Sequence, residues 1–179
     1  IGSCSNPYIN QTIGSVSVFV RENGKWRLQQ KFRGNDTETD DAFPSAVALA
    51  GDGNTALVGA FMDTVGQNSD QGSAYVFVRS GEHWTQQQKL TAADGGQWHM
   101  FGNAVALAND GNTALVGDSW KHAAYVFTRG GGVWSQQARL TPSDPDPYYA
   151  NFASALALAN SGAIAVIGDY ECARLFVRN

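Results

Sequence analysis

The sequence is poor in charge, in cysteine and in long apolar runs. Its 179 residues carry 12 Lys and Arg against 16 Asp and Glu, which gives a net charge of -4 without clustering. A nucleic-acid-binding surface normally shows a basic stripe, so we expect no nucleic-acid partner. The apolar runs are far shorter than a membrane-spanning helix requires, so we expect no transmembrane segment within these residues.

The two cysteines, Cys4 and Cys172, lie near opposite ends of the chain. Two cysteines are too few for the dense disulfide framework of small secreted domains. Three states stay open: a disulfide between them, separate disulfides to segments outside the chain, or two free thiols. Glycosylation sequons begin at Asn10 and Asn35, both in predicted loops. They favour a secretory protein with an extracellular or luminal location.

Internal repetition is the dominant feature of the sequence. A block with a central phenylalanine occurs four times, at Phe19, Phe77, Phe127 and Phe176. A second block, rich in glutamine, begins at Trp26, Trp84 and Trp134. An alanine-rich block follows at residues 46–50, 104–108 and 155–159, and a fourth block ends in glycine at residues 55–59, 113–117 and 164–168. Such self-similarity is the signature of a repeat architecture.

Each block predicts one β-strand. The blocks are short, rich in β-branched or aromatic residues, and bounded by turn residues. Asp52-Gly53 and Asp110-Gly111 join the third and fourth blocks, and Asp-Gly between apolar runs predicts a type I′ hairpin. The repeating unit is therefore predicted to be a four-stranded antiparallel meander.

The predicted strands differ in polarity. The alanine-rich strand is small and apolar on both faces, which suits a position crowded on every side near a ring axis. The Trp-Gln-Gln-Lys strand is half polar, which suits a solvated outer edge where charge opposes edge-to-edge aggregation. Four-stranded units arranged radially are the blades of a β-propeller. We therefore predict an all-β fold, an incomplete β-propeller, with a β-sandwich as the alternative that fails to explain the fixed block order.

The predicted propeller segment divides into four units. Residues 43–100 and 101–151 form full blades, whereas residues 1–42 supply strands two to four of a blade and residues 152–179 supply strands one to three. Each unit of a repeat protein buries its faces only against its neighbours. We therefore expect the chain to be a fragment of a longer one or to pair its ends with another copy, and to be oligomeric or aggregation-prone when expressed alone.

The order of the motifs resembles the FG-GAP repeat. Phe101-Gly102, an apolar strand, a Gly-Asn-rich hairpin and Val116-Gly117-Asp118 follow one another. The same frame runs from Phe43 to Ala60 and from Phe152 to Asp169. Over nearly its whole length the chain thus resembles the integrin-alpha-type β-propeller family, which implies a propeller fold and a role in binding, adhesion or scaffolding.

The resemblance also raises the question of calcium. The family often binds calcium in the hairpin between its first two strands, through an Asp-rich loop. The matching hairpins here, residues 51–54, 109–112 and 160–162, offer one Asp each at most. Calcium requires several oxygen ligands, many of them carboxylate. We therefore predict no metal in these hairpins and no cofactor.

The remaining polar candidates favour no catalytic chemistry. The acidic loop Asp36–Asp41 carries carboxylates that suit a cation, but a solvated loop between blades is the preferred interpretation. The histidines His83, His99 and His122 stand in different loops and are predicted to be solvated. Nothing resembles a nucleophile elbow, a phosphate loop or a metalloprotease helix. We predict a protein that is not an enzyme and has no catalytic residues.

The aromatic residues fall into two groups. The tryptophans that recur with the repeat are predicted to pack one blade against the next. The aromatics that do not recur lie in variable connections: Trp98, Trp120, Tyr148 and Tyr149. Loops on a rigid scaffold usually carry binding, and Trp and Tyr are typical interface anchors. We predict that these four bind a partner, with local packing under a loop as the alternative.

Three functions fit these observations. The first is a non-enzymatic protein–protein interaction or scaffolding module that binds through variable rim loops. The second is a structural accessory subunit of a larger, membrane-associated assembly. The third is lectin-like binding of a glycan, because the same aromatics suit sugar stacking.

Overall fold

The computed structural model describes residues 2–3, 13–142, 151–169 and 173–177. Cys4, Asn10, Tyr148, Tyr149 and Cys172 lie outside these residues. All regular structure in the described part of the chain is β, in four antiparallel sheets and without a helix. The prediction of an all-β chain built from antiparallel units is confirmed.

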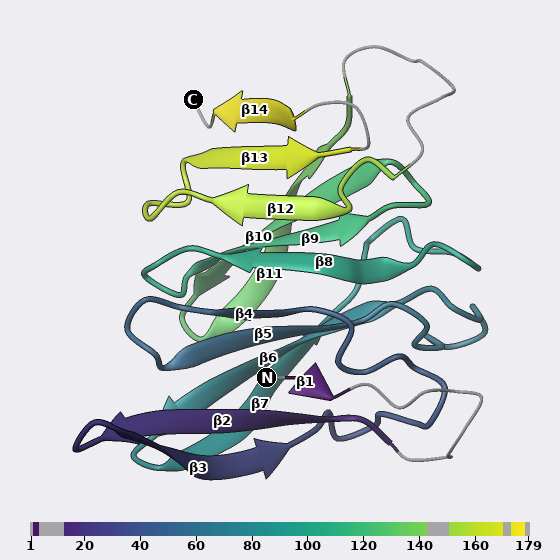
Figure 1. Cartoon of the computed structure of the whole chain (residues 1–179). Helices are drawn as coiled ribbons and strands as arrows, with labels where there is room; N and C mark the ends of the chain where they lie inside the picture. The colour runs from purple at the N-terminus through teal and green to yellow at the C-terminus, as the bar shows by residue number, and fades with distance from the viewer. Residues whose placement is uncertain (1, 4–12, 143–150, 170–172, 178–179) are drawn as a thin grey trace.

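Each sheet is formed by consecutive strands (Figure 1). The first sheet contains β1 (Gly2–Ser3), β2 (Ser15–Glu22) and β3 (Lys25–Phe32). The second contains β4 (Val47–Leu49), β5 (Thr55–Ala60), β6 (Ser73–Ser80) and β7 (His83–Leu90). The third contains β8 (Phe101–Leu107), β9 (Thr113–Asp118), β10 (Ala123–Gly130) and β11 (Val133–Leu140). The fourth contains β12 (Ala155–Leu158), β13 (Ile164–Gly168) and β14 (Ala173–Val177).

The hairpins between the first and second strands of a unit differ from the predicted type. Only the glycine of each Asp-Gly pair has a positive φ, 70° at Gly53 and 67° at Gly111. The N–H of Ala50 donates to the carbonyl of Thr55 at 2.9 Å, so residues 51–54 form a four-residue loop, within which the N–H of Gly53 donates to the carbonyl of Ala50 at 2.9 Å. The type I′ prediction was therefore wrong, because a loop of this length is usually built on a type I turn.

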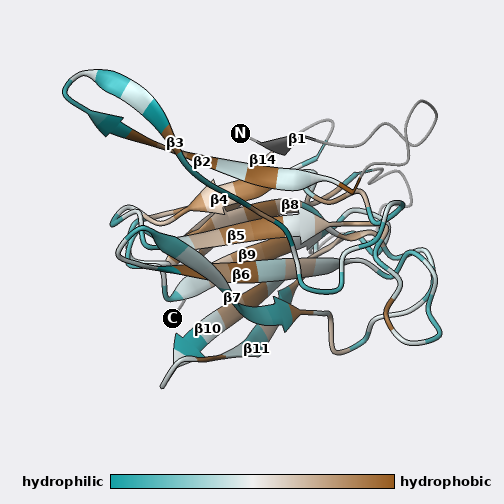
Figure 2. Cartoon of the chain, turned by 90° about the horizontal axis from the view of Figure 1, so that it is seen from below, coloured by the Kyte–Doolittle hydropathy of each residue, from teal (hydrophilic) through white to brown (hydrophobic). Residues whose placement is uncertain are grey.

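The core lies between neighbouring sheets. Alternation along a strand sends successive side chains to opposite faces, so a central strand serves two interfaces. In β6, Tyr75 and Phe77 pack toward the first sheet, whereas Val76 packs toward the third. A third cluster joins the third and fourth sheets around Phe152 and Ile167. Figure 2 shows the apolar residues concentrated along these central strands, with hydrophilic loops at the sheet ends.

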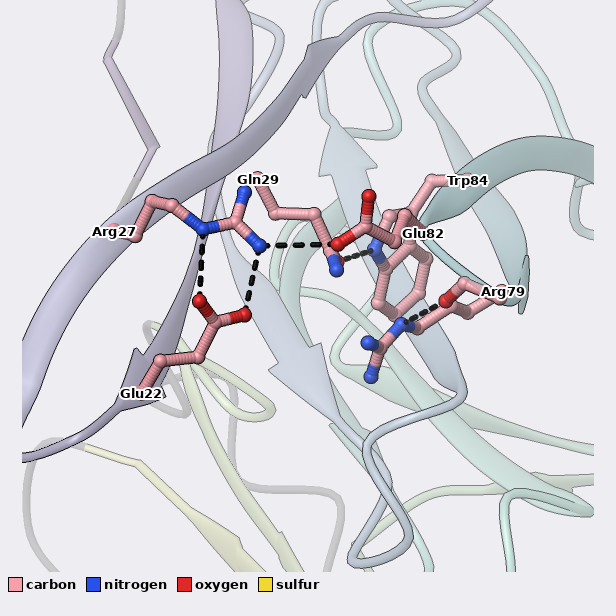
Figure 3. A network of polar contacts seen from close by, with 7 residues as sticks. Glu22, Arg27, Gln29, Arg79, Glu82 and Trp84 are labelled. Atoms are coloured by element: carbon pink, nitrogen blue, oxygen red, sulfur yellow. Dashed lines mark hydrogen bonds and ion pairs between the residues drawn. The ribbon is translucent and has the colours of Figure 1, made fainter.

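The glutamine-rich outer strands link one sheet to the next. Gln30 accepts the backbone N–H of Trp84 at 2.8 Å and donates to its carbonyl at 3.1 Å. The Trp84 indole donates to the amide oxygen of Gln29 at 3.2 Å, and Arg27 bridges to Glu82 beside it (Figure 3). These contacts explain why paired glutamines recur, which the sequence left without a reason.

Two expectations about packing were wrong at particular positions. Trp84 and Trp134 are 4% and 3% exposed, but Trp26 is 69% exposed because no sheet in the described structure covers its side of β3. The alanine-rich strand, which is the first strand of each repeating unit, was predicted to be crowded on every side. In the second sheet this strand is β4, and its Val47 and Leu49 are 49% and 59% exposed. These two residues lie on an edge strand that no other described strand pairs with on its outer side.

Candidate functional site

Two of the predicted binding residues lie at the same end of the third sheet. Trp98 stands in the loop that leads into β8, and Trp120 stands in the loop between β9 and β10. Phe101 pairs with Asp118 across these two strands, so the loops start side by side. The side chains of Trp98 and Trp120 are 56% and 64% exposed. The structure therefore places both tryptophans at the surface of one loop cluster.

The backbone of Trp98 is held in an unusual conformation. Its N–H donates to the carbonyl of Ser69 at 2.9 Å, and its φ is 64°. Positive φ also occurs just before the phenylalanine of each repeat, at Ala42, Met100 and Asn151, where it belongs to the repeated fold. Trp98 is not at that repeated position. A bulky residue in this region is strained, and such strain clusters at binding sites.

A cavity opens beside Trp120. It measures about 430 Å³ and is lined by Met100, Ser119, Trp120, His122 and Asn151. His122 has a φ of 49° where the preceding repeat has Gly72, at 81°. Its Nδ1 is buried and has no hydrogen-bond partner among the described residues. The cavity thus offers an exposed aromatic face and one buried polar atom.

A buried carboxylate lies at the end of β9, next to this cavity. Asp118 is fully buried, and its Oδ1 accepts the N–H of Lys121 at 2.9 Å. Its Oδ2 has no hydrogen-bond partner in the described part of the chain, and His99 Nδ1 lies 3.9 Å away, beyond hydrogen-bonding distance. Burial raises the pKa of Asp118 to about 7. Burial and then the charge of Lys121 lower the pKa of His99, so the two form no ion pair at neutral pH.

The second sheet also contains a buried acid near the end of its second strand, but it pairs this acid with a cation. Ala60 holds the repeat position of Asp118, and the acid is Asp63, three residues further along the chain. Its Oδ2 lies 2.6 Å from Lys89 Nζ and accepts the Tyr75 hydroxyl at 3.2 Å. Lys89 also contacts Asp36 at 2.7 Å. Although burial lowers the pKa of Lys89, its hydrogen bonds to Asp36 and Asp63 outweigh burial and raise that pKa above its usual range. Lys89 is therefore not the solvated edge charge that the sequence predicted.

In the third sheet the equivalent cation contacts the equivalent loop acid. Arg139 occupies the position of Lys89, and its Nε lies 3.5 Å from Oδ2 of Asp94, which is the repeat counterpart of Asp36. The hydroxyl of Tyr125, like Asp118 Oδ2, is buried without a partner among the described residues. In the second sheet an ammonium group thus contacts the buried acid Asp63, whereas among the described residues of the third sheet no Lys or Arg side chain forms an ion pair with the buried acid Asp118.

This arrangement predicts a pH-dependent stability that Asp118→Asn removes. Folded Asp118 keeps its proton up to about pH 7, whereas an unfolded aspartate loses its proton near pH 4. The folded state therefore binds more protons in this window, and stability falls as the pH rises from about 4 to about 7. Asp118→Asn should be more stable than the parent at pH 8, by up to about 4 kcal/mol, and equal to it at pH 4.

Urea unfolding followed by circular dichroism at both pH values measures this difference. Asp110→Asn is the matched control, because Asp110 lies in an exposed hairpin, and we expect no pH-dependent gain from it. A variant Asp118→Asn that is less stable than the parent at pH 8 would contradict the prediction.

The polar cluster of Asp118 and His99 was not predicted from the sequence. His99 was predicted to be solvated, but only 12% of its side chain is exposed. The available signal was the acid that follows the glycine of the fourth block, at Asp118 and again at Asp169. In the fourth sheet Asp169 contacts Arg174, which stands where the other sheets have tyrosine. Neither the partner nor the burial of these acids follows from spacing alone.

The acidic loop before the second sheet is partly engaged in the fold. Asp36 contacts Lys89, and Asp41 accepts the N–H of Glu38 at 2.6 Å. Burial raises the pKa of Asp41. In the hairpins, Asp52 accepts the N–H of Asn54 at 2.9 Å. Within the described ranges, no group of three or more His, Cys, Asp or Glu is placed so that it could hold a metal ion.

The second glycosylation sequon begins at Asn35, which is exposed in the loop after β3.

The successive antiparallel units and their loop cluster define a β-repeat protein that presents its variable residues at the sheet ends. The FG-GAP repeat family matches residues 26–77 and 84–127, and the chain belongs to this family. No curated protein matches the chain. FG-GAP repeats are typical of extracellular, integrin-like interaction proteins. The described residues contain no helix of the length and apolarity needed to cross a bilayer.

Proposed function

We propose that the chain is a segment of an FG-GAP β-propeller that acts as a non-enzymatic protein-interaction module outside the cytoplasm. The order of the sheets supports the propeller: each is a meander, and each packs face to face with the next in chain order (Figure 1). In such a ring every sheet would be one blade. The partner binds at the loop end of the third blade.

The observation that carries this proposal is the pair of exposed tryptophans on anchored loops. Trp98 and Trp120 present large apolar surfaces to solvent, while each of their loops is held by a hydrogen bond, one to β8 and one to the loop between β5 and β6. Ser119 N–H donates to the side chain of Asn103 at 3.2 Å, and Trp98 N–H to Ser69. Rigid aromatic side chains bind with little loss of conformational entropy. The cavity beside Trp120 gives a partner side chain a place to insert.

We propose a structural rather than a catalytic role for the polar cluster of Asp118 and His99. A general base has to reach the proton that it removes. Asp118 is fully buried below the loop cluster, and His99 Nδ1 lies beyond hydrogen-bonding distance of its carboxylate. We therefore assign no catalytic role to either residue.

Selection of a random peptide library displayed on phage, with the intact chain as bait, tests the proposed site. Enriched peptides should lose affinity by about tenfold or more on Trp98→Ala and on Trp120→Ala, as expected for interface anchors. Trp26→Ala is the matched control, since Trp26 is at least as exposed as the two loop tryptophans but lies on β3 of the first sheet. Fluorescence anisotropy with labelled peptides measures the affinities.

Other results separate the alternatives. Peptides that bind the parent and both loop variants equally would contradict the proposed site. Binding on a glycan array that Trp98→Ala and Trp120→Ala abolish, together with no enriched peptide, would establish the lectin-like alternative instead.

A further inference from the structure

One carboxyl group lies below both loops of the proposed binding site. Oδ1 of Asp118 accepts the N–H of Lys121 at 2.9 Å, which closes the turn of residues 119–122 that carries Trp120. Oδ2 of the same side chain lies 3.9 Å from Nδ1 of His99, the neighbour of Trp98 in the chain. The protonation state of Asp118 can therefore act on the two tryptophan loops together.

This carboxyl group is buried without a cation beside it. Asp118 is fully buried, and its Oδ2 has no hydrogen-bond partner among the described residues. Other buried acids of the chain contact a cation, Asp63 with Lys89 and Asp169 with Arg174. A carboxylate that is buried without such a partner is costly, so it either takes up a proton or gains contact with water.

The charges around Asp118 do not offset its burial. The ionisable side chains that face it come from the connection between β7 and β8, from β10, from β11 and from the turn itself: Asp94, His99, Tyr125, Arg139 and Lys121. Burial raises the pKa of Asp118 to about 7 and outweighs Lys121 and Arg139, which lower this pKa, whereas Asp94 raises it. His99 is uncharged at neutral pH because burial lowers its pKa. Near neutral pH the charge of this cluster therefore changes mainly at Asp118.

The two tryptophan loops differ in how they are held. The backbone of the first is hydrogen-bonded to the backbone of the loop between β5 and β6, as at Trp98 itself. The turn of residues 119–122 is held instead by two side chains, those of Asp118 and Asn103. This turn is therefore the element that can move and admit water to the carboxyl group. It also carries Trp120 and lines the cavity beside it.

We propose that Asp118 is a pH-sensitive latch on the binding site: when protonated it holds the turn of residues 119–122 closed, and when ionised it releases the turn. This proposal rests on the proposed binding role of Trp98 and Trp120. The closed turn orients Trp120 and shapes the cavity, so a partner should bind the protonated form more tightly. A bound partner also keeps water away from the carboxyl group, so binding and proton uptake are coupled.

Proton linkage gives the size of the effect. In the closed state the pKa of Asp118 is about 7, whereas a hydrated aspartate has a pKa near 4. The closed state binds more protons between these values, so a rise in pH disfavours it. From pH 6 to pH 8 the equilibrium between closed and open turn should shift toward the open form by about tenfold.

NMR of the intact chain without a partner tests the latch itself. After correction for the intrinsic exchange rate, the backbone N–H of Lys121 should exchange with solvent about tenfold faster at pH 8 than at pH 6. This exchange should not depend on low concentrations of urea, which distinguishes opening of the turn from unfolding of the whole chain.

Two variants assign this difference to Asp118. Asp118→Asn keeps an acceptor for the N–H of Lys121 and supplies a donor toward His99 without a charge, so its exchange should show no such difference between the two pH values. Asp110→Asn is the matched control, because Asp110 lies in an exposed hairpin, and it should retain the difference of the parent.

Peptides selected from the phage library on the intact chain at pH 6 test the consequence for binding. In the parent their affinity, measured by fluorescence anisotropy, should be about threefold to tenfold weaker at pH 8 than at pH 6. Asp118→Asn should remove this difference. His122→Gln, which removes the imidazole from the cavity wall, should keep it.

The possible results separate the latch from the binding site. Equal exchange of the Lys121 amide at both pH values, or a difference that persists in Asp118→Asn, would overturn the latch. Equal peptide affinities at both pH values would also overturn it, even if Trp98→Ala and Trp120→Ala still weaken binding and so support the site. Loss of the pH difference on His122→Gln would overturn the assignment to Asp118. If no peptide is enriched, the proposed function fails, and exchange of the Lys121 amide decides alone on the latch.

Discussion

Gly59→Ala is expected to destabilise the chain by about 3 kcal/mol, although it adds a single methyl group. A Cβ at this position would lie 2.0 Å from the carbonyl oxygen of Gly102 in the next unit. Both backbone groups are hydrogen-bonded: the N–H of Gly59 donates to the carbonyl of Ala46 at 2.9 Å, and the carbonyl of Gly102 accepts the Ser45 hydroxyl at 2.9 Å. Neither can move without breaking these hydrogen bonds. Urea unfolding followed by circular dichroism measures the loss.

Gly168→Ala provides the matched control. Gly168 has the same position in the repeat, but a Cβ there would meet nothing closer than the Cβ of Ala155 at 3.2 Å. We expect a cost below about 1 kcal/mol. Equal losses for the two variants would show that the close approach of the next unit does not explain the glycine at position 59.

Lys89→Met is expected to cost about 3 kcal/mol, since it removes the cation that neutralises a buried acid. The Asp63 side chain is 4% exposed, and Lys89 lies 2.6 Å from it. Methionine keeps most of the volume, so the loss reports the charge rather than packing. The unfolding free energy at pH 7, compared with that of Lys89→Met combined with Asp63→Asn, measures it. The double variant should recover much of the loss, because the buried acid is then neutral.

Lys31→Met is the control for this prediction. Lys31 has the same place in β3 that Lys89 has in β7, but its side chain is exposed. A change at such a position usually stays within about 0.5 kcal/mol. If Lys31→Met is as costly as Lys89→Met, the ion pair with Asp63 does not explain the effect.

Most of the fold could be predicted from the chain alone because strand formation and hairpin formation depend on local sequence. Alternation, turn residues and repetition located the strands of all four sheets, and the motif order identified the FG-GAP family. The predicted hairpin type at Asp52-Gly53 was wrong, because the turn type depends on the loop length, which is set by where the hydrogen-bond ladder between the two strands ends. The predicted burial of the alanine-rich strand was also wrong at Val47 and Leu49, because burial requires a neighbouring element that the sequence pattern cannot specify.

The candidate site was less predictable. Trp98 and Trp120 could be selected because they break the repeat, but their meeting at one end follows from the pairing of β8 with β9. The approach of His99 to Asp118 likewise brings together residues that are distant in sequence. No local pattern indicates such contacts.

By itself, then, the sequence determined the repeating unit, its strand order and the positions that break the repetition. The tertiary structure decided whether residues at equivalent repeat positions are buried or exposed and which residues they contact. Trp26 and Trp84 share a repeat position, but one is exposed and the other buried. Asp63 and Asp118 are both buried acids, but Lys89 neutralises only the first. The physical reason is that each sheet buries its faces against its neighbours, so the same residue is core or surface according to what lies beside it.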